Sequence, residues 1–449
     1  MVQAAALRKA YLPHLDIGDD QTLDRVDSRN TLIVVVLKDN DGYVQTVFRR
    51  NDLLDVELMD MTYGRDRLRV VSRSGMRRLK QKLGVEVMQP FPLFSGKWTT
   101  VLDVAIRELE YVDIPINEQS MVRLPTDQFL AVFEKAEVKQ IAKRKPTDIR
   151  VADARRVEES ILEFTKLKIK RRLDETIELP PLSPSAKQLM DLRIDPNANL
   201  MDLVHIIEKD PSLTASILRW SKSSYYTHAG QVTDLRDAIG RVMGFELVMN
   251  LAMGLVLSGA IEMPEEHPEG FMEYWKQAIW VSQISASLTR CIPQEHRPKV
   301  GICYLIGILH NFGYLILGHV FPTYFNLMCR HWEANRHHDT YIVEKSVLGI
   351  TREDIAAQLF KCWDMPPEIV NAIQHQKDDT YDGEYSTYVD MIQASRSLLV
   401  ERLGLDLGYE VPPSKRYLDR LGVDRERLEE QLVLLDESRS HVDSLAALL

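Results

Sequence analysis

The sequence is poor in cysteine, and none of its cysteines forms a paired motif. Cys291, Cys303, Cys329 and Cys362 lie singly, with no C-x-x-C spacing among them. Neither a zinc ribbon nor a disulfide framework is therefore predicted, and the expected state of these side chains is a reduced, buried thiol.

Long hydrophobic runs are also missing. The most apolar stretch, Leu247 to Ile261, spans 15 residues and carries Asn250 and Ser258. A membrane-spanning helix needs about 20 apolar residues, so this stretch predicts a core helix. The opening residues 1–15 lack the apolar core of a secretory signal. We therefore expect a cytoplasmic protein that makes no membrane contact.

Common catalytic signatures are absent as well. The sequence contains no G-x-x-x-x-G-K-[ST], G-x-S-x-G or H-E-x-x-H, no dinucleotide fingerprint, and no GGDEF or EAL signature. These absences exclude the motif-defined P-loop, serine-hydrolase and zinc-protease classes. Nothing in the sequence calls for a bound cofactor.

The composition is that of a folded protein with two domains. The 449 residues are 45% hydrophobic and 27% charged, which is typical of a folded protein. A chain of this length is too long for one ordinary core. The net charge of −10 argues against a nucleic-acid coat. Residues 1–150 sum to about +2 and the rest to about −12. Any contact with a polyanion is therefore expected in the first half.

The first 140 residues mix strand and helix patterns. Thr31 to Arg50 holds two β-branched runs around Asp41-Gly42, which predicts a hairpin. Leu68–Ser72 and Thr99–Ala105 are further strand-like runs, and Ser74–Leu83 places apolar residues on one helical face before a glycine. These alternations predict an α+β domain over residues 1–140.

The rest of the chain is expected to be helical. A charged stretch at 141–175 predicts a helical connector, and residues 176–405 predict an all-α domain. Asn199 and Asp210-Pro211 have the residue types that begin helices. Residues 406–449 form a tail whose leucines recur at helical spacing and are expected to cover the chain's own core, although pairing with another chain is the alternative. The predicted fold class is thus multidomain, α+β followed by all-α.

The helical half carries a family resemblance. The segments LPPLSPSAKQL, EKDPSLTASILRWSKSSYY, VTDLRDAIGRVMG, GILHNFGYL and GITREDIAAQLFKCWDMPPEIVNAIQHQ occur in order between residues 175 and 400. Together they resemble the HDOD domain, a helical signalling relative of the HD phosphohydrolases. The resemblance implies a helical domain that acts in signal transduction.

True HD hydrolases hold one or two metal ions with several His and Asp side chains. At the corresponding positions this chain has Gln277, the pair His310-Asn311, and His375 followed by Gln376, and Arg352 and Ser395 stand near two others. The bridging carboxylate has become an amide. The resemblance therefore implies that the metal set is broken, so no metal and no catalysis are expected.

The surviving polar residues have two readings. His310 and His375 can be hydrogen-bonded core histidines, which is the commoner role of a histidine on an apolar helix. Alternatively, Gln277, His310, Asn311 and His375 line a cleft that holds a small ligand. The pair His337-His338 is predicted to lie in a solvated loop.

The first domain resembles the YbaK/prolyl-tRNA synthetase-associated editing domain, whose members hydrolyse misacylated tRNA. The resemblance lies in the order of TLIVVVLK, LRVV, VMQPFPLF, TTVLDVAIRELE and LPTDQFLAVF. It implies a candidate pocket at Asn30, Gly84, Pro92 and Asp103. Asn30 stands where active relatives carry a catalytic lysine, and the second glycine of their loop is missing, so deacylation is not expected.

A basic run follows the first hairpin. Between residues 65 and 82 the sequence has one acidic residue, Asp66, and eight basic residues, which are Arg65, Arg67, Arg69, Arg73, Arg77, Arg78, Lys80 and Lys82. Such a run can contact phosphate, which would be tRNA in a deacylase relative. A solvated face explains it equally well, as does docking to the acidic second half.

These observations favour a non-catalytic bacterial regulatory protein whose helical domain binds an unidentified signalling protein or a small ligand. One alternative is a metal-dependent nucleotide phosphohydrolase of the HD type. Another is a trans-acting aminoacyl-tRNA deacylase, which would require Asn30 or the basic run.

Overall fold

The computed structural model divides the chain into two compact units. Unit 1 comprises residues 1–149, 267–269 and 326–347, and unit 2 comprises the remainder. The residues that the structure describes are 29–63, 68–85, 87–91, 98–115, 121–133, 136–146, 183–195, 197–222, 232–258, 267–269, 274–320, 322–403 and 411–437, with a few isolated positions between them. Each unit is described by itself.

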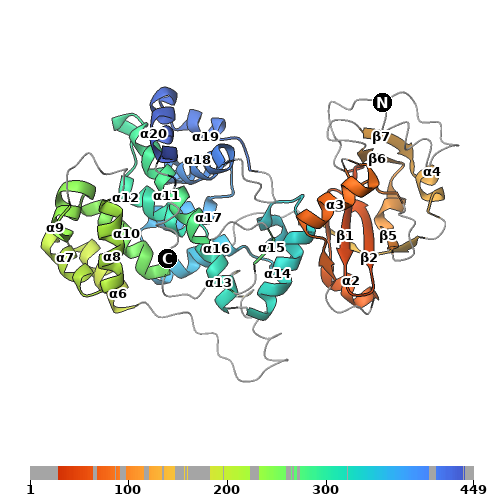
Figure 1. The fold of residues 1–449 in the computed structure, drawn as a ribbon, viewed down its shortest axis with the longest axis horizontal. Helices are drawn as coiled ribbons and strands as arrows, with labels where there is room; N and C mark the ends of the chain where they lie inside the picture. The colour runs from red at the N-terminus through yellow and green to blue at the C-terminus, as the bar shows by residue number, and fades with distance from the viewer. Residues whose placement is uncertain are drawn as a thin grey trace, which may run out of the picture. The chain divides into compact units, whose positions relative to one another are not determined.

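Unit 1 is built on a mixed five-stranded sheet with strand order β4-β1-β2-β5-β8. Its strands are β1 (Leu32–Lys38), β2 (Tyr43–Arg49), β4 (Arg69–Val70), β5 (Trp98–Asp103) and β8 (Glu137–Lys139). The β1–β2 hairpin is antiparallel, whereas β2–β5 and β5–β8 are parallel. Strands β1, β2 and β5 can be followed in Figure 1. The predicted hairpin and α+β class are confirmed.

Short elements complete unit 1. Two antiparallel pairs join β3 (Asp52–Leu54) to β9 (Ala142–Arg144) and β6 (Tyr111–Pro115) to β7 (Met121–Pro125). The helices are α2 (Val56–Tyr63), α3 (Arg73–Leu83) and α4 (Thr126–Ala131), and a 3-10 turn covers Val104–Glu108. One core contains Leu32, Leu102 and Phe129, and another contains Leu37, Phe48 and Met59.

Two helices from the second half of the chain also belong to unit 1. They are α14 (Pro322–Ala334), from residue 326 onward, and α15 (Thr340–Leu348), up to residue 347. Ala334 is buried in the same core as the sheet residues Leu37 and Phe48. The predicted all-α range 176–405 is therefore divided between the units, because residues 326–347 pack with the N-terminal sheet.

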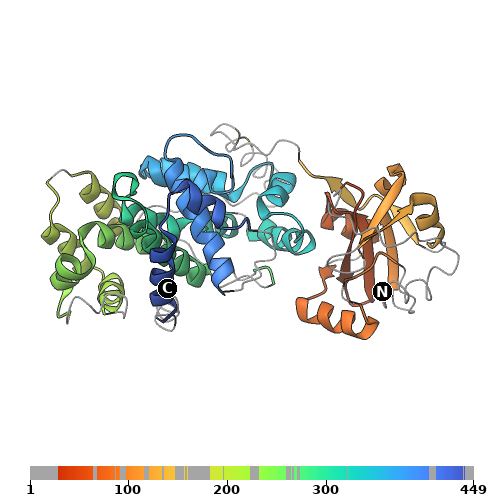
Figure 2. The same ribbon diagram turned by 90° about the horizontal axis from the view of Figure 1, so that it is seen from above.

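All described regular structure in unit 2 is helical, as the green to blue ribbons of Figure 2 show. Its first helices are α6 (Pro184–Ile194), α7 (Leu200–Glu208), α8 (Pro211–Ser221), α9 (Leu235–Asp237), a π-helix (Ala238–Met243) and α10 (Phe245–Ser258). They are followed by α11 (Tyr274–Arg290), a 3-10 turn (Gln294–His296), α12 (Val300–Leu309), α13 (Phe312–Val320), α16 (Arg352–Cys362), α17 (Pro367–His375), α18 (Ser386–Leu403), α19 (Lys415–Arg420) and α20 (Arg425–Glu437).

The helix starts follow from local chemistry. Asn199 and Asp202 form a capping box at α7, and the Asp210 side chain accepts the Ser212 and Leu213 N–H groups ahead of Pro211. In the tail, Leu418, Leu421, Leu428, Leu432 and Leu435 are all buried within the single chain. Helices α19 and α20 pack on α18 and α11 respectively.

One apolar segment of unit 2 has the length and composition of a membrane span. It is Val300–His319, which includes α12 and most of α13, and 94% of its apolar window is buried inside the protein. A helix that is apolar on all sides and buried by its neighbours is typical of a protein core.

Two local predictions differ from the structure. Residues 142–144 form strand β9, because their backbone pairs with β3, so they do not begin a helical connector. Most of the remaining connector lies outside the described residues. Cys362 is exposed, while Cys291, Cys303 and Cys329 are buried, and all four are free.

Candidate functional site

The structure brings four of the HD-like residues, Gln277, His310, Asn311 and Gln376, together on packed helices of unit 2. Gln277 lies on α11, His310 directly follows α12, and Asn311 links α12 to α13. The Asn311 amide donates to the Gln277 side-chain oxygen at 3.4 Å. Gln376, which follows α17, donates to the His310 carbonyl at 2.7 Å. The side-chain amides of Asn311 and Gln376 thus form hydrogen bonds at the positions where a hydrolase would bind a metal.

His310 is a buried neutral imidazole. Its Nδ1 lies 2.7 Å from the Gly307 carbonyl, and because a carbonyl only accepts, Nδ1 carries the proton. Its Nε2 is buried without a hydrogen-bond partner. Burial, together with the positive charges of Arg396, Arg352 and Lys377, lowers the pKa of His310 to about 3. This environment disfavours any added positive charge.

His375 has a different partner. Its ring stacks on Tyr381, with ring centroids 4.0 Å apart and an interplanar angle of 27°. Its Nδ1 is buried without a hydrogen-bond partner. Burial lowers the pKa of His375, while Asp378 and Asp354 oppose that shift. The imidazole packs as a flat aromatic surface against the tyrosine.

The two remaining HD-like positions are also occupied by structural side chains. Arg352 is buried at the start of α16, and its Nε lies 3.4 Å from the Glu353 carboxylate. Ser395 donates to the Met391 carbonyl at 2.7 Å, and its hydroxyl lies 2.8 Å from that of Ser285. Neither side chain replaces the carboxylate lost at Asn311.

These residues do not fit a divalent metal. A metal site needs deprotonated or anionic ligands, whereas the position beside His310 is the uncharged amide of Asn311, and the positive charges of Arg396, Arg352 and Lys377 act on the imidazole. Among the described residues, no group of three His, Cys, Asp or Glu side chains within ligand distance lies at these positions. The chemistry left to this cluster is hydrogen bonding and packing.

The charge environment of His310 predicts a pH-dependent stability. The folded-state pKa of about 3 lies below the ordinary 6.5, so the neutral form is favoured by folding. Its stabilisation is present above pH 6.5 and is lost as the pH falls toward 3. Between pH 7 and pH 5 the loss from this group amounts to about 2 kcal/mol.

The measurement is the free energy of unfolding in urea at pH 7 and pH 5 for the wild type and His310→Gln. The variant is expected to lose about 2 kcal/mol less than the wild type over this interval. His205→Gln replaces an exposed histidine of α7 and should keep the wild-type difference. Equal losses in the wild type and His310→Gln would contradict the assignment.

The three described residues of the predicted N-terminal pocket make contacts that stabilise the fold. Asn30 accepts the Asp113 N–H through its carbonyl, and Gly84 ends α3 with a left-handed φ of 67°. Asp103 is buried, and its carboxylate accepts the N–H groups of Ala105, Ile141 and Ala142. Pro92 lies outside the described residues. Asp103 therefore pins β9 to the sheet, a role that its position in the sequence did not reveal.

The basic run divides into buried contacts and an exposed face. Arg69 donates to the Asn326 side chain at 3.1 Å, and the Arg73 N–H donates to the Glu269 carboxylate. These partners come from the second half of the sequence and lie in unit 1. Arg69 and the Arg73 backbone thus contact later segments of the chain within unit 1, and docking of the run to the second domain stays a prediction.

The other described members of the run lie on α3. Arg77, Arg78 and Lys82 are exposed there, and Lys80 is half-buried. Arg65 and Arg67 lie outside the described residues. A role of this helix face in phosphate binding stays a prediction.

The pair His337-His338 lies in a loop between α14 and α15, as predicted, but its rings contact β3 instead of being fully solvated. Both rings point Nε2 at the Asp52 carbonyl, at 3.0 and 3.2 Å, and the His337 ring packs against Phe48. Burial lowers the pKa of His337 to about 3. The pair is part of the packing between the α14–α15 connection and β3, which a reading of the local polar sequence could not show.

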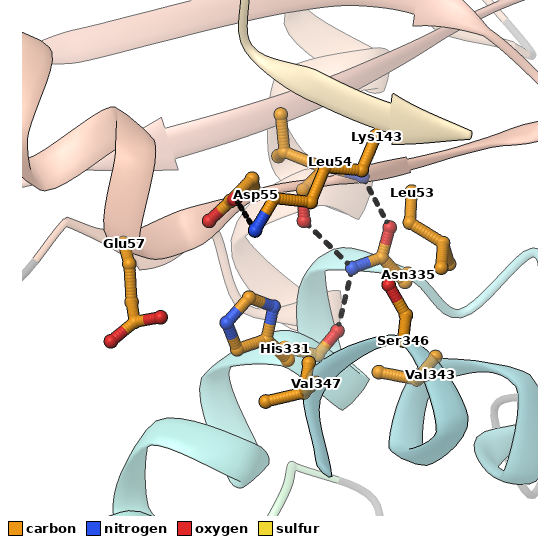
Figure 3. A pocket seen from close by; sticks show the side chains of 10 residues that line it. All are labelled: Leu53, Leu54, Asp55, Glu57, Lys143, His331, Asn335, Val343, Ser346 and Val347. Carbon is orange, nitrogen blue, oxygen red and sulfur yellow. Dashed lines mark hydrogen bonds and ion pairs between the residues drawn. The ribbon is translucent and has the colours of Figure 1, made fainter. Parts of the chain in front are cut away.

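The sequence also missed a polar cavity in unit 1. It is lined by residues that follow β3, by Lys143 of β9, and by residues of α14 and α15. Figure 3 shows Asp55, His331 and Asn335 around it. Asn335 accepts the Leu54 N–H at 2.7 Å and donates to the Leu54 carbonyl at 3.0 Å. No local signal connects these residues, because β3 and α14 are about 280 positions apart.

Comparison with known proteins identifies the class. The HDOD domain model matches residues 179–379. A crystal structure of a protein from Marinobacter aquaeolei VT8, provisionally named a signal transduction protein, is 39% identical to this chain. It covers 99% of both chains with a TM-score of 0.84. The fold is thus that of a protein with a helical HD-like domain. The chain belongs to the HDOD domain family, as predicted.

Two further relatives cover parts of the chain. An uncharacterized protein of Treponema pallidum (strain Nichols) is 20% identical over 241 residues, and this match spans 54% of the chain and 45% of that protein. A structure provisionally named a trans-editing enzyme for prolyl tRNA synthetase resembles the N-terminal region. It is 15% identical, covers 32% of this chain and 96% of its own, and has a TM-score of 0.27. At that score the likeness carries no argument about activity.

Proposed function

We propose that the protein is a non-catalytic regulator whose HDOD domain binds a signalling protein or a small ligand. The observation that carries this proposal is the environment of His310, a buried imidazole next to Asn311, whose amide bonds to that of Gln277. The positive charges of Arg396, Arg352 and Lys377 further disfavour a cation there. A hydrolase would need anionic ligands at these positions to ionise a water molecule. Amides and a buried imidazole provide recognition groups instead.

The family context supports this proposal. The Marinobacter relative is provisionally assigned to signal transduction and aligns along the whole chain. We extend that role to this chain. A cytoplasmic location is part of the same proposal. No observation in unit 1 favours aminoacyl-tRNA deacylation, because the described residues of the predicted pocket stabilise strands and turns.

Manganese binding tests the proposal at the HD-like positions. Because His310 lacks anionic partners, Mn²⁺ is expected to bind the wild type and His310→Gln with the same stoichiometry and affinity. Titration calorimetry on the full chain after chelator treatment measures both. An ion bound by the wild type and lost in His310→Gln would support the phosphohydrolase alternative and overturn the proposed function.

A further inference from the structure

The polar cavity of unit 1 gathers three groups that can ligate a metal. Asp55 follows β3, Glu57 lies in the first turn of α2, and His331 comes from α14. One ligand atom from each lies within 4.8 Å of the others. The cavity that they line has a volume of about 60 Å³, which is room for an ion and a water molecule. Figure 3 shows the His331 ring between the two carboxylates and Asn335.

The His331 imidazole is the second, independent observation. The residue is only 4% exposed, yet its Nε2 has no hydrogen-bond partner. A buried polar atom is normally satisfied, so an unpartnered nitrogen beside two carboxylates points to a ligand that the fold is built to receive.

The cavity already contains a positive charge. Lys143 Nζ lies 2.5 Å from Asp55 Oδ2, and that carboxylate is 4% exposed. The lysine side chain is 56% exposed and can turn outward into solvent. The Lys143 ammonium thus occupies a position beside the Asp55 carboxylate, and it competes with a metal ion for that carboxylate. Asp55 Oδ1 is used separately, as it accepts the Leu58 N–H at the start of α2.

We propose that Asp55, Glu57 and His331 bind one divalent transition-metal ion, of which Zn²⁺ is the best fit. One imidazole nitrogen and two carboxylate oxygens are a ligand set that zinc accepts, whereas Mg²⁺ prefers oxygen ligands alone. Bonds of about 2.1 Å place tetrahedral ligand atoms about 3.4 Å apart, so the exposed Glu57 side chain turns inward on binding. Three protein ligands leave the fourth position to water.

The ion would join elements that are far apart in sequence. Asp55 and Glu57 belong to the N-terminal fold, and His331 belongs to the family-matched region at residues 179–379. Binding would hold α14 against β3 and α2 within unit 1. This site does not depend on the HD-like cluster around His310, and its test gives a separate result.

The test is calorimetric titration of the chelator-treated full chain with Zn²⁺. We expect one tight ion per chain, and Mg²⁺ should not displace it. Glu57→Gln and His331→Gln each remove a ligand and should weaken binding by about tenfold or more. Lys143→Gln removes the competing ammonium and should tighten binding by about threefold or more.

Two variants guard against misfolding. Glu57 and Lys143 are exposed, so their substitution leaves the buried core intact even if His331→Gln does not fold. Glu208→Gln, at an exposed position of α7, is the matched control and should bind like the wild type. Unchanged affinity in Glu57→Gln, or a loss of affinity in Lys143→Gln, would overturn the proposed site.

Discussion

Replacing Asn335 with alanine is expected to lower the free energy of unfolding of unit 1 by about 3 kcal/mol. The Asn335 side chain is 1% exposed and satisfies both the N–H and the carbonyl of Leu54. Alanine leaves both backbone groups buried without these partners, and each unsatisfied group costs about 1–3 kcal/mol. Urea unfolding measures the loss, and hydrogen exchange at the Leu54 amide reports it locally.

Asn326→Ala is the matched control, because Asn326 lies on α14, the helix that Asn335 directly follows. Asn326 is half-buried and accepts a single hydrogen bond from Arg69, so its loss is expected to cost less than about 1 kcal/mol. If Asn335→Ala were no more destabilising than Asn326→Ala, the bond between α14 and β3 would not be the main polar contact that we describe.

Gly313→Ala is expected to destabilise unit 2 by about 3 kcal/mol. A Cβ at Gly313 would lie 2.1 Å from the Arg352 carbonyl oxygen and 2.6 Å from its carbon. Both are backbone atoms, so α13 and α16 must separate to admit the methyl group, and overpacking of this kind costs about 1–3 kcal/mol or more. The urea-unfolding free energy of unit 2 measures the effect.

Gly240→Ala provides the comparison. There a Cβ would lie 3.4 Å from a terminal carbon of the Leu200 side chain, which can move. The expected change is within about 1 kcal/mol, since alanine also favours the helical backbone. Equal destabilisation by the two substitutions would show that α13 and α16 are not packed as closely as the structure places them.

Much of the fold could be predicted because its signals are local. The hairpin at Asp41-Gly42 and the helix starts at Asn199 and Asp210 depend on residues a few positions apart. The spacing of the tail leucines likewise indicated which face is buried. For these elements the sequence pattern and the tertiary packing agree.

The composition of unit 1 could not be predicted in the same way. Residues 326–347 have a helical pattern like the rest of their half, and only the three-dimensional packing shows that they join the N-terminal sheet. His337-His338 looked like a polar loop, because its partner, the Asp52 carbonyl, is 285 positions away. The cavity around His331 depends on the same long-range contact.

The HD-like cluster lies between these cases. The residue identities at Gln277, His310 and Asn311 were readable from the family resemblance, and the structure places them on packed neighbouring helices. The cationic surroundings were not readable, because Arg396 and Lys377 lie on other segments. The lost ligands, together with those charges, are why we propose a binding role for the cluster.

Hydrolysis by the full chain tests the central claim most directly. The protein is incubated with Mn²⁺ and a panel of nucleotides, cyclic nucleotides and phosphomonoesters, beside His310→Ala. We predict no phosphate or nucleotide release above the protein-free background in either sample. Turnover by the wild type that is lost in His310→Ala would contradict the account and establish a metal-dependent hydrolase.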